Sequence, residues 1–336
     1  MKKYNVCIVG IRGAVGQCML KILQQRKFPV NELRLMSQNP EDCPPYKFNG
    51  KTIRAVKLDH AAFDGMQIGL FSPGAEISKI YAPSAAKAGC VVIDNTSQFR
   101  MDKDVPLVVP EVNPEDAKKH KGIIANPNCS TIQMVVALKP LHDYGKIKRV
   151  VVSTYQSVSG AGSEAIEELE KQAVNRKLTP KKFAHPIAYN LIPQIDVAQD
   201  NHYTKEEMKM VKETNKIMGD NSIKVTATCV RVPVFYAHSE SVNVETRKKI
   251  TRAKAIELLK KAPGVKIIDD LPKNRYPLPL MAQGKDDTFV GRIREDETIN
   301  NGLNLWVVSD NLRKGAALNA VQIAELLIKK NWLGKK

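Results

Sequence analysis

The sequence lacks most of the features that mark membrane, metal-binding or disulfide-stabilised proteins. No apolar run in its 336 residues approaches the length needed to cross a bilayer. Its six cysteines are widely scattered and none forms a CxxC pair, so we expect no zinc knuckle, no thioredoxin-type site and no metal. We expect five of the six to be buried, unreactive thiols. The first residues carry lysines before only a short apolar stretch, which predicts no signal peptide and a cytoplasmic location.

Aromatic residues are also scarce, at 6% of the chain, although the net charge is +17. Such a charge invites the hypothesis of a nucleic-acid partner. However, the lysines and arginines occur as singles and pairs, without a basic block or tail, and few aromatic side chains are present to stack on bases. We therefore expect a solvated basic surface that suits small anionic substrates, with no nucleic-acid and no membrane partner.

Internal repeats and low-complexity linkers are absent, and the length suggests two domains. Over roughly the first 125 residues, short apolar runs alternate with helical patterns. These runs are "YNVCIVG", "LRLMS", "QIGLFS", "CVVIDN" and "GIIANP". Alternating strands and helices predict an α/β, doubly wound, Rossmann-like domain with a mostly parallel sheet.

The remainder of the chain has a different pattern, which predicts an α+β domain with a mixed sheet. Charged amphipathic helices are expected at "SEAIEELEKQAVNRK" and "KEEMKMVKETNKIMG". The long alternating run "IKVTATCVRVPVFYAHSESVNVET" is interpreted as antiparallel strands exposed on one face. A final helix, "KGAALNAVQIAELLIKK", carries an apolar stripe whose packing partner cannot be read from its own sequence.

The first candidate site is the turn "VGIRGAVG", which contains Gly10, Gly13 and Gly16. It follows a predicted strand and opens a predicted helix, as a dinucleotide phosphate turn does. The spacing is GxxGxxG rather than GxGxxG, so a tight turn without a ligand remains an alternative. The position at the start of an α/β domain favours nucleotide binding.

The choice of nucleotide depends on the end of the second predicted strand, where the adenosine ribose is expected. An acidic residue there indicates NAD, and a basic residue indicates NADP. The tip carries Ser37, Gln38 and Asn39, which are neither. Arg12, inside the first turn, is a cation that could reach a 2′-phosphate.

The second candidate is Cys129, in "IIANPNCSTIQMVVAL". Ser130 and Thr131 are residues that open helices well, and the run after them has helical spacing. A thiol at a helix N-terminus is stabilised as thiolate, and the N–H groups there could hold an oxyanion. A cysteine of ordinary pKa near a helix cap is the open alternative.

The third candidate is the pair Arg231 and His238 in "CVRVPVFYAHSESV". A separation of seven residues points two side chains to opposite faces of a regular strand. Pro233 lies between them and could break that regularity. A lone histidine is more often structural than catalytic, so His238 gains weight only if it faces the thiol.

Several stretches together resemble aspartate-β-semialdehyde dehydrogenase of the bacterial type, essentially from end to end. They are "VGIRGAVG", "DNTSQFRMD", "PLVVPEVN", "NPNCST", "STYQSVSGAG", "EEMKM", "CVRVPVFYAHSESV" and "VVSDNLRKGAALNAVQIAE". The resemblance implies reduction of L-aspartyl 4-phosphate to L-aspartate 4-semialdehyde with NADPH, releasing phosphate, in lysine, threonine and methionine biosynthesis. Alternatives are an N-acetyl-glutamyl-phosphate reductase-like enzyme and a non-catalytic paralogue.

The resemblance also implies roles for individual residues. Cys129 would form the acyl-thioester, Gln156 would orient the substrate and His238 would be the acid/base. Substrate-binding positions are Arg231 for the α-carboxylate, Glu206 for the amino group, Arg100 and Lys209 for phosphate, and Asn128 beside the thiol. Cofactor-binding positions are Gly10, Arg12, Gly13, Ala14, Val15, Gly16, Ser37, Gln38, Ser159, Gly160 and Asn311.

The same resemblance implies a domain division and an oligomer. Residues 1–127 would bind the dinucleotide, completed by a C-terminal helix at 313–336, and residues 128–312 would carry catalysis and dimerisation in a homodimer or tetramer. Two departures concern the cofactor: "GIRGAVG" has Arg12 where the family has threonine, and "SQNP" lacks the family's arginine. Either Arg12 replaces that arginine and NADP is used, or NAD is accepted.

Overall fold

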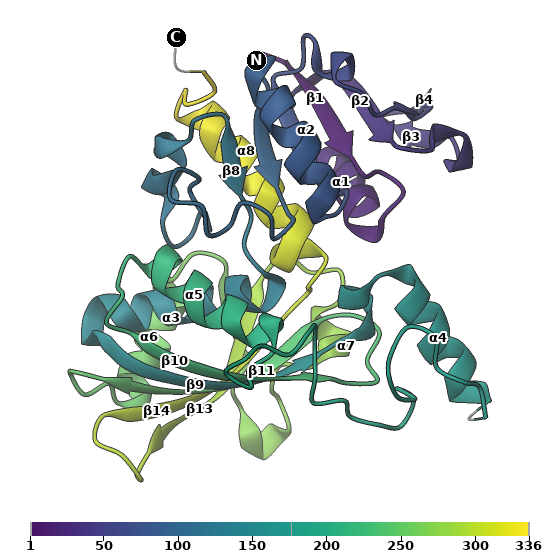
Figure 1. Cartoon of the computed structure of the whole chain (residues 1–336). Helices are drawn as coiled ribbons and strands as arrows, with labels where there is room; N and C mark the ends of the chain where they lie inside the picture. Colours follow the sequence, from purple (N-terminus) through teal and green to yellow (C-terminus); the bar gives the residue numbers. More distant parts are fainter. Residues whose placement is uncertain (1, 176, 335–336) are drawn as a thin grey trace. The chain divides into compact units, whose positions relative to one another are not determined.

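The chain divides into two compact units, each with its own sheet and hydrophobic core. The computed structural model describes residues 2–175 and 177–334. Within them, one unit consists of two segments, the residues up to Pro127 and those from Ala316 onward, and the other comprises Asn128–Gly315 (Figure 1). The first unit is an α/β fold and the second contains a mixed sheet, as the sequence predicted.

A parallel sheet forms the first unit, in the order β5-β2-β1-β6-β7-β8 among the described residues. Its strands β6 and β7 are buried on both faces and are therefore rich in apolar residues, although β7 ends in Asp94. The strands are β1 (Tyr4–Val9), β2 (Val30–Ser37), β5 (Val56–Lys57), β6 (Ile68–Phe71), β7 (Val91–Asp94) and β8 (Ile123–Ala125), with a separate hairpin of β3 (Tyr46–Phe48) and β4 (Lys51–Ile53). The helices are α1 (Ala14–Gln25), α2 (Ala75–Lys87) and α8 (Leu318–Lys329), with 3₁₀ turns at Pro40–Asp42, Ala61–Phe63 and Pro114–Lys119.

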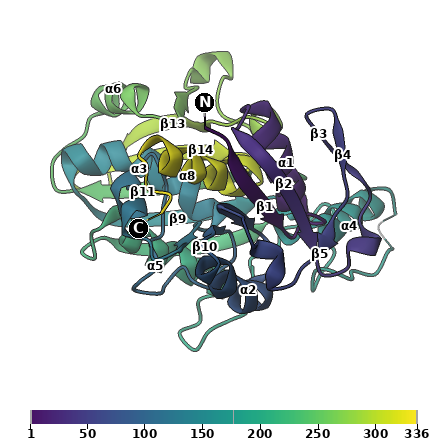
Figure 2. The same ribbon diagram turned by 90° about the horizontal axis from the view of Figure 1, so that it is seen from above.

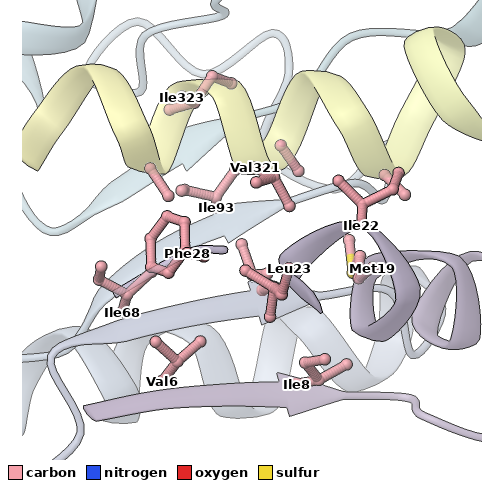
Figure 3. Close-up of a cluster of buried hydrophobic side chains, with 14 of the residues drawn as sticks. Val6, Ile8, Met19, Ile22, Leu23, Phe28, Ile68, Ile93, Val321 and Ile323 are labelled. Carbon is pink, nitrogen blue, oxygen red and sulfur yellow. The ribbon is translucent and has the colours of Figure 1, made fainter. Parts of the chain in front are cut away.

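Helices α1 and α8 pack together over one face of this sheet. Ile22 and Leu23 of α1 lie in the same buried cluster as Val321 of α8 and Ile8 of β1 (Figure 3). The other face is covered by α2, whose Ser78 donates a hydrogen bond of 2.9 Å to Asp94 at the end of β7. The apolar stripe of the last helix therefore packs in the core of the first unit, which its own sequence could not reveal.

The C-terminal helix is shorter than the predicted 313–336. Arg313–Ala317 form a π-helical turn and α8 covers only Leu318–Lys329. Asn331 adopts a left-handed backbone (φ 55°), which ends the helix in the usual way. Residues 335–336 lie outside the described residues.

The order of the parallel strands reverses beside β1, because β2 and β6 flank it on opposite sides. Ligands of open α/β sheets bind at the carboxyl ends of the strands where such a reversal occurs. Gly10 follows β1 at this point, with φ +86°, and a Cβ on it would lie 2.6 Å from the Ser72 carbonyl oxygen just beyond β6. Only glycine fits this close approach.

The second unit has a mixed sheet in the order β10-β9-β11-β14-β13-β12 within the described residues. The strands are β9 (Ile147–Gln156), β10 (Lys224–Arg231), β11 (His238–Thr246), β12 (Val265–Ile267), β13 (Thr288–Asp296) and β14 (Gly302–Ser309). The helices are α3 (Cys129–Gly145), α4 (Ser163–Val174), α5 (Lys205–Met218), α6 (Arg252–Lys261) and α7 (Pro279–Ala282), with 3₁₀ turns at Val158–Ala161 and Leu271–Lys273.

Helices α3, α5 and α6 contact the sheet of the second unit (Figures 1 and 2). The buried core beneath α3 is aliphatic and includes Leu138 of the helix, Val152 of β9 and Val242 of β11. Within the described part of the chain, no helix is both long enough and apolar enough to span a membrane.

One expectation about the second sheet was wrong in detail. The long alternating run forms β10 and β11, but these strands do not pair with each other. Both flank β9, which pairs parallel with β10 and antiparallel with β11. The connection contains Pro233 and also Ala237 with φ +70°, so the alternation of one continuous strand is interrupted there.

Candidate active site

Cys129 is the first residue of α3, and Asn128 is the N-cap of that helix. The Asn128 Oδ1 atom accepts hydrogen bonds from the backbone N–H groups of Ser130 (3.0 Å) and Thr131 (3.3 Å). These N–H groups have no partner inside the helix, which is why Asn is favoured at this position. The expectation that Ser130 and Thr131 open the helix was wrong, and their hydroxyl oxygens are buried without a hydrogen-bond partner among the described residues.

Gly315 allows the chain to pass directly beside Cys129. A Cβ added to Gly315 would lie 2.8 Å from the Cys129 Cβ, closer than real Cβ atoms approach. Any side chain at position 315 would therefore displace the thiol. Gly315 was not predicted as a site residue, although it lies within "VVSDNLRKGAALNAVQIAE", one of the stretches that carry the family resemblance.

Exposure distinguishes Cys129 from half of the six cysteines. Cys129 is partly exposed, whereas three others are buried, namely Cys7, Cys90 and Cys229. Cys18 and Cys43 are also partly exposed, so the expectation of five buried thiols was wrong for these two. Burial raises the pKa of the Cys229 thiol, which makes it a poor nucleophile.

Two glutamates of α5 hold the residue that precedes the thiol. The Asn128 side-chain amide donates to Glu206 (2.8 Å), and the Asn128 backbone N–H donates to Glu213 (2.7 Å). Glu213 was missed from the sequence, although its spacing of seven residues from Glu206 puts both on one face of a helix. Cys129 therefore follows a residue that is fixed at both its backbone and its side chain.

Glu206 is buried and lies at the centre of an ionic cluster. It accepts hydrogen bonds from Gln156 (3.2 Å) and from Lys209 (3.0 Å), and Lys209 also pairs with Asp196 (2.9 Å). Burial raises the pKa of Glu206, but the Lys209 charge and the hydrogen bonds outweigh it and lower the pKa below its ordinary value. In the same way, burial lowers the pKa of Lys209, but the Glu206 charge leads to a net increase. Both groups are therefore ionised at neutral pH.

Neighbouring strand ends bring Arg231, Gln156 and His238 together. Arg231 at the end of β10 pairs with Gln156 at the end of β9, and His238 begins β11 on the other side of β9. A Cβ on Gly160 would lie 3.0 Å from Arg231 Nη1 and 3.2 Å from His238 Nε2, so both side chains reach the same glycine. The odd spacing of Arg231 and His238 is no obstacle, because they belong to different strands.

His238 is fully buried, and its orientation is set by Ser157. The ring Nδ1 accepts a hydrogen bond of 3.0 Å from the Ser157 backbone N–H. Because Nδ1 is an acceptor, the proton of the neutral ring must lie on Nε2. Nε2 has no partner among the described residues. Burial, and then the Arg231 charge, lowers the pKa of His238 to about 3, so the ring is neutral at physiological pH.

Ser159 and Asn311, two of the predicted cofactor positions, form the next layer of hydrogen-bonded residues around His238. The Asn311 Oδ1 atom accepts hydrogen bonds from Ser157 (3.2 Å), from Ser159 (3.2 Å) and from the Ala237 backbone N–H (2.9 Å). Ser157 was not proposed from the sequence, although it lies in "STYQSVSGAG". Arg231 Nη1 donates to the Ser157 carbonyl oxygen (2.7 Å), which links this layer to the arginine.

Arg100 belongs to the first unit and is buried there. Its Nε donates to the Asn126 carbonyl oxygen (3.0 Å) and its Nη2 to that of Asn95 (2.8 Å). Asn126 is three residues before Cys129 in the sequence. The predicted role of Arg100 in binding phosphate stays a prediction.

The glycine turn of the first unit has the properties of a phosphate cradle. Helix α1 begins at Ala14, and its N-cap Gly13 provides no side-chain hydrogen bond to the N–H groups of the first turn. A Cβ on Gly16 would collide with the Gly10 carbonyl oxygen, so glycine lets α1 pack closely on the turn. Ala14 and Val15 supply N–H groups at the positive end of a twelve-residue helix. The turn fits a dinucleotide pyrophosphate.

Arg12 is tied to the loop that follows β2. Its guanidinium forms an ion pair of 2.9 Å with Asp42, and both side chains are at least half exposed. Ser37 ends β2, and its hydroxyl hydrogen-bonds within the loop to the Asn39 carbonyl oxygen (3.2 Å). The side chain of Gln38 is exposed. Arg12 therefore lies beside the segment at which the ribose of a dinucleotide is expected.

The second unit thus gathers a thiol, a buried cation, an ionic cluster and an imidazole N–H donor. Burial lowers the pKa of Arg231, and the charges of Glu206 and Cys129 partly oppose this decrease. Arg231 therefore interacts electrostatically with both groups. Among the residues that the structure describes, no group of three or more His, Cys, Asp or Glu could hold a metal ion. These groups suit acyl transfer to a thiol from a substrate that carries both an amino group and a carboxylate.

Two family models match the chain. The model described as "Semialdehyde dehydrogenase, NAD binding domain" matches residues 5–120, and the one described as "Semialdehyde dehydrogenase, dimerisation domain" matches residues 138–314. The first indicates a nicotinamide dinucleotide cofactor, and the second supports oligomerisation.

Individual relatives agree with this assignment. Aspartate-semialdehyde dehydrogenase of Aquifex aeolicus is 58% identical, over 98% of this chain and 99% of the relative. Aspartate-semialdehyde dehydrogenase 2 of Vibrio cholerae is 52% identical over 98% of both chains. The crystal structure of aspartate semialdehyde dehydrogenase II from Vibrio cholerae, complexed with ASA, is similar with a TM-score of 0.94 and 51% identity, over 98% of this chain and 99% of that one. The chain therefore belongs to the aspartate-semialdehyde dehydrogenase family of oxidoreductases.

Proposed function

We propose that the chain converts L-aspartyl 4-phosphate to L-aspartate 4-semialdehyde and phosphate, using NADPH and an acyl-thioester on Cys129. The observation that carries this proposal is the position of Cys129 at the start of α3, in the same unit as Arg231 and His238. The reaction would serve lysine, threonine and methionine biosynthesis. A relative crystallised with ASA supports the same substrate class.

In the first step Cys129 acts as a thiolate. The positive end of α3 and the charge of Arg231 stabilise that form. His238 does not remove the thiol proton, because its Nδ1 already accepts from Ser157 and its Nε2 carries the ring proton. The thiolate sulfur attacks the acyl carbon, a carbon–sulfur bond forms, and the bond to the phosphate oxygen breaks.

The charged side chains select the substrate. The Arg231 guanidinium retains donors beyond the one used by Ser157 and clamps the α-carboxylate. The Glu206 carboxylate binds the amino group, and Gln156, hydrogen-bonded to Glu206, orients the acyl group beside the thiol. Lys209 and Arg100 are the proposed ligands of the departing phosphate.

His238 stabilises charge on the reacting oxygen. When bound, the nicotinamide cofactor supplies the hydride that reduces the thioester carbon. The Nε2–H of His238, which is buried and without another partner among the described residues, donates a hydrogen bond to the oxygen that becomes negative. As the aldehyde forms, the carbon–sulfur bond breaks and Cys129 returns to the thiolate.

The glycine turn and the layer around His238 are the proposed cofactor contacts. The N–H groups of Ala14 and Val15 would hold the pyrophosphate. Ser159, Gly160 and Asn311 would contact the nicotinamide end. For the ribose end we propose that Arg12 binds the 2′-phosphate of NADP, because its ion pair with Asp42 is exposed and such pairs are weak.

The proposed activity is tested with purified protein, L-aspartate 4-semialdehyde, phosphate and NADP, by following the formation of NADPH. We expect phosphate-dependent turnover that is lost in Cys129→Ala and kept in Cys18→Ala, a matched change of a partly exposed thiol in α1. N-acetylglutamate semialdehyde serves as the competing substrate. A preference for it, or turnover in Cys129→Ala, would refute the proposal.

The role of Arg12 predicts a measurable cofactor preference. We expect the protein to prefer NADP over NAD by at least about tenfold in kcat/KM, which is about 1.4 kcal/mol of differential binding. Arg12→Ala should reduce this preference through the KM for NADP, whereas Asp42→Ala, which releases the arginine from its ion pair, should keep it. Equal rates with NADP and NAD in the unmodified protein would contradict this role.

We further propose a homodimer, with a tetramer as the alternative. The residues of β9 that alternate with its buried ones are only partly buried, among them Val151, Ser153 and Tyr155. Ser241 on the neighbouring β11 is exposed. A second copy on this face would bury these side chains, and light scattering coupled to size-exclusion chromatography would distinguish monomer, dimer and tetramer.

A cytoplasmic location is proposed as well, since a reducing compartment keeps the cysteines as the free thiols they are here.

A further inference from the structure

The face of the second sheet that packs against α3 changes from polar to apolar over three rows of residues. In antiparallel pairs, directly opposed residues point to the same face. His238 stands opposite Ser309 in the first row. In the next row Glu240 stands opposite Thr154 and Val307. In the third row Val242 stands opposite aliphatic residues of the core, namely Val152 and Leu305. Glu240 thus lies between the proposed active site and the aliphatic core.

Glu240 has no hydrogen-bond partner for either carboxyl oxygen among the described residues, and it is fully buried. Burial raises the pKa of this group well above its ordinary value, and the nearby Gln133 amide offsets only part of the effect. A buried carboxyl group in such surroundings is protonated at neutral pH. The mechanism proposed above does not use it.

Gln133 lies on α3 one turn after Cys129, so the two side chains share one face of the helix. Its Nε2 donates a hydrogen bond of 3.3 Å to the His238 carbonyl oxygen. Its Oε1 is buried without a partner among the described residues. A protonated carboxyl group has an O–H to donate, and this amide oxygen requires a donor.

We propose that Glu240 and Gln133 form a neutral pair that ties the start of β11 to the first turns of α3. The carboxyl O–H donates to Gln133 Oε1, and Gln133 Nε2 donates to the His238 backbone. The pair fixes the position of His238 relative to Cys129, so Glu240 is a positioning residue. This inference rests on the proposed function, in which Cys129 attacks the acyl carbon and His238 donates a hydrogen bond to the oxygen on that carbon.

A merely structural role and a positioning role predict different outcomes for an aliphatic replacement. Glu240→Met fills a similar volume but leaves the buried Gln133 Oε1 without a donor, which is destabilising. We expect its Tm to fall below that of the unmodified protein. Its kcat should fall at least about tenfold, with KM within about twofold, because small displacements of catalytic groups slow the chemical step.

Two further variants sharpen the test. Glu240→Gln keeps a neutral group that can donate to Gln133 Oε1, so its kcat should stay within about threefold. Val307→Ala, in the same row, creates a cavity without removing a polar group, so its Tm should fall while kcat is unchanged. Unchanged kcat in Glu240→Met, or loss of kcat in Glu240→Gln equal to that in Glu240→Met, would overturn the positioning role.

The neutral pair also has a readout that does not depend on activity. The infrared difference spectrum of the unmodified protein minus Glu240→Gln at neutral pH should contain the C=O band of a protonated carboxyl group. Absence of that band would overturn the pair even in an active enzyme. If the unmodified protein has no dehydrogenase activity, the proposed function fails, and the infrared band alone then decides whether the pair exists.

Discussion

At the scale of single residues, the main feature is that His238 is neutral and has a fixed tautomer. The Ser157 N–H occupies Nδ1, and burial together with the Arg231 charge prevents a second proton from binding. In the proposed mechanism His238 therefore acts as a hydrogen-bond donor, and Cys129 depends on α3 and Arg231 for its ionisation. In this respect the site differs from a thiolate–imidazolium pair, in which the ring takes the thiol proton.

Replacing His238 by glutamine should lower kcat by about 10²- to 10³-fold, the usual cost of removing one donor to a developing oxyanion, with KM little changed. Because the pKa of His238 is about 3, the profile of kcat against pH should contain no step from this ring between about pH 5 and 8. Steady-state kinetics over this range would check both. A profile that loses an inflection near pH 6.5 only in His238→Gln would contradict the neutral state.

The same pKa has a consequence for stability. The folded pKa is depressed, so the unfolded chain binds more protons than the folded one between about pH 3 and 6.5. The stability of the unmodified protein relative to His238→Gln should therefore decrease as the pH falls through this window, by on the order of 1 kcal/mol per unit. Urea unfolding of both proteins at several pH values measures it. A constant difference would contradict the burial of an uncharged ring.

The predicted residues of the second unit do lie close together, but their partners could not be foreseen. Glu206, Lys209 and Gln156 form one hydrogen-bonded cluster. Glu213 accepts a hydrogen bond from a backbone N–H, and Gly315 is required because it has no side chain. Neither effect leaves a local pattern in a sequence. The tautomer of His238 likewise depends on a backbone group from another strand.

At the scale of elements, α5 and the glycine turn each carry several of the proposed binding groups. Helix α5 begins with a capping box, in which Thr204 accepts from the Glu207 N–H (3.3 Å) and the Glu207 side chain accepts from the Thr204 N–H (2.7 Å). The helix then presents Glu206 and Lys209 one turn apart on one side. The stability of this first turn is therefore coupled to the position of the two charges that we propose bind the substrate.

Thr204→Ala should lower the free energy of unfolding by about 1 kcal/mol and raise the KM for aspartate semialdehyde. Thr251 is the matched control, because it caps α6 in the same way (3.2 Å to the Lys254 N–H) but α6 carries no proposed site residue. Thr251→Ala should lose similar stability at an unchanged KM. Equal effects of the two variants on KM would contradict the special role of α5.

The glycine turn offers a second matched pair. Gly16→Ala places a Cβ against the Gly10 carbonyl oxygen, and such overpacking costs about 1–3 kcal/mol. Gly13→Ala meets its nearest atom at 3.5 Å, an ordinary contact, and should cost less than about 1 kcal/mol. Binding of NADP, followed by isothermal titration calorimetry, should be lost or strongly weakened only in Gly16→Ala. Equal binding by both variants would contradict the close-packed cradle.

Local patterns predicted most elements of the fold but not all of their partners. The alternation of apolar strands and helices up to Ala125 predicted a parallel sheet, which the structure contains. Between Lys224 and Thr246, the alternation of apolar and polar residues correctly predicted strands. It did not predict their pairing, because β9, which is far away in sequence, lies between them. Pairing across a sheet is a long-range property that the pattern of one segment does not encode.

At the scale of the whole molecule, the chain builds two cores and divides the proposed chemistry between them. The glycine turn, Arg12 and Arg100 belong to the first unit, and the thiol with its partners belongs to the second. The assignment of cofactor binding to residues 1–127 and of catalysis to residues 128–312 stays a prediction. The net charge of +17 is suited to attracting small anionic ligands, since both the proposed substrate and the cofactor carry phosphate.

In the proposed reaction Cys129 becomes acylated by the substrate. The most direct test is to mix the protein with L-aspartate 4-semialdehyde and NADP without phosphate, quench with acid, and map the modified peptide by mass spectrometry. We expect an aspartyl group on the peptide that contains Cys129, and its disappearance when phosphate is added before the quench. Turnover without an adduct at Cys129, or an adduct on another cysteine, would contradict it.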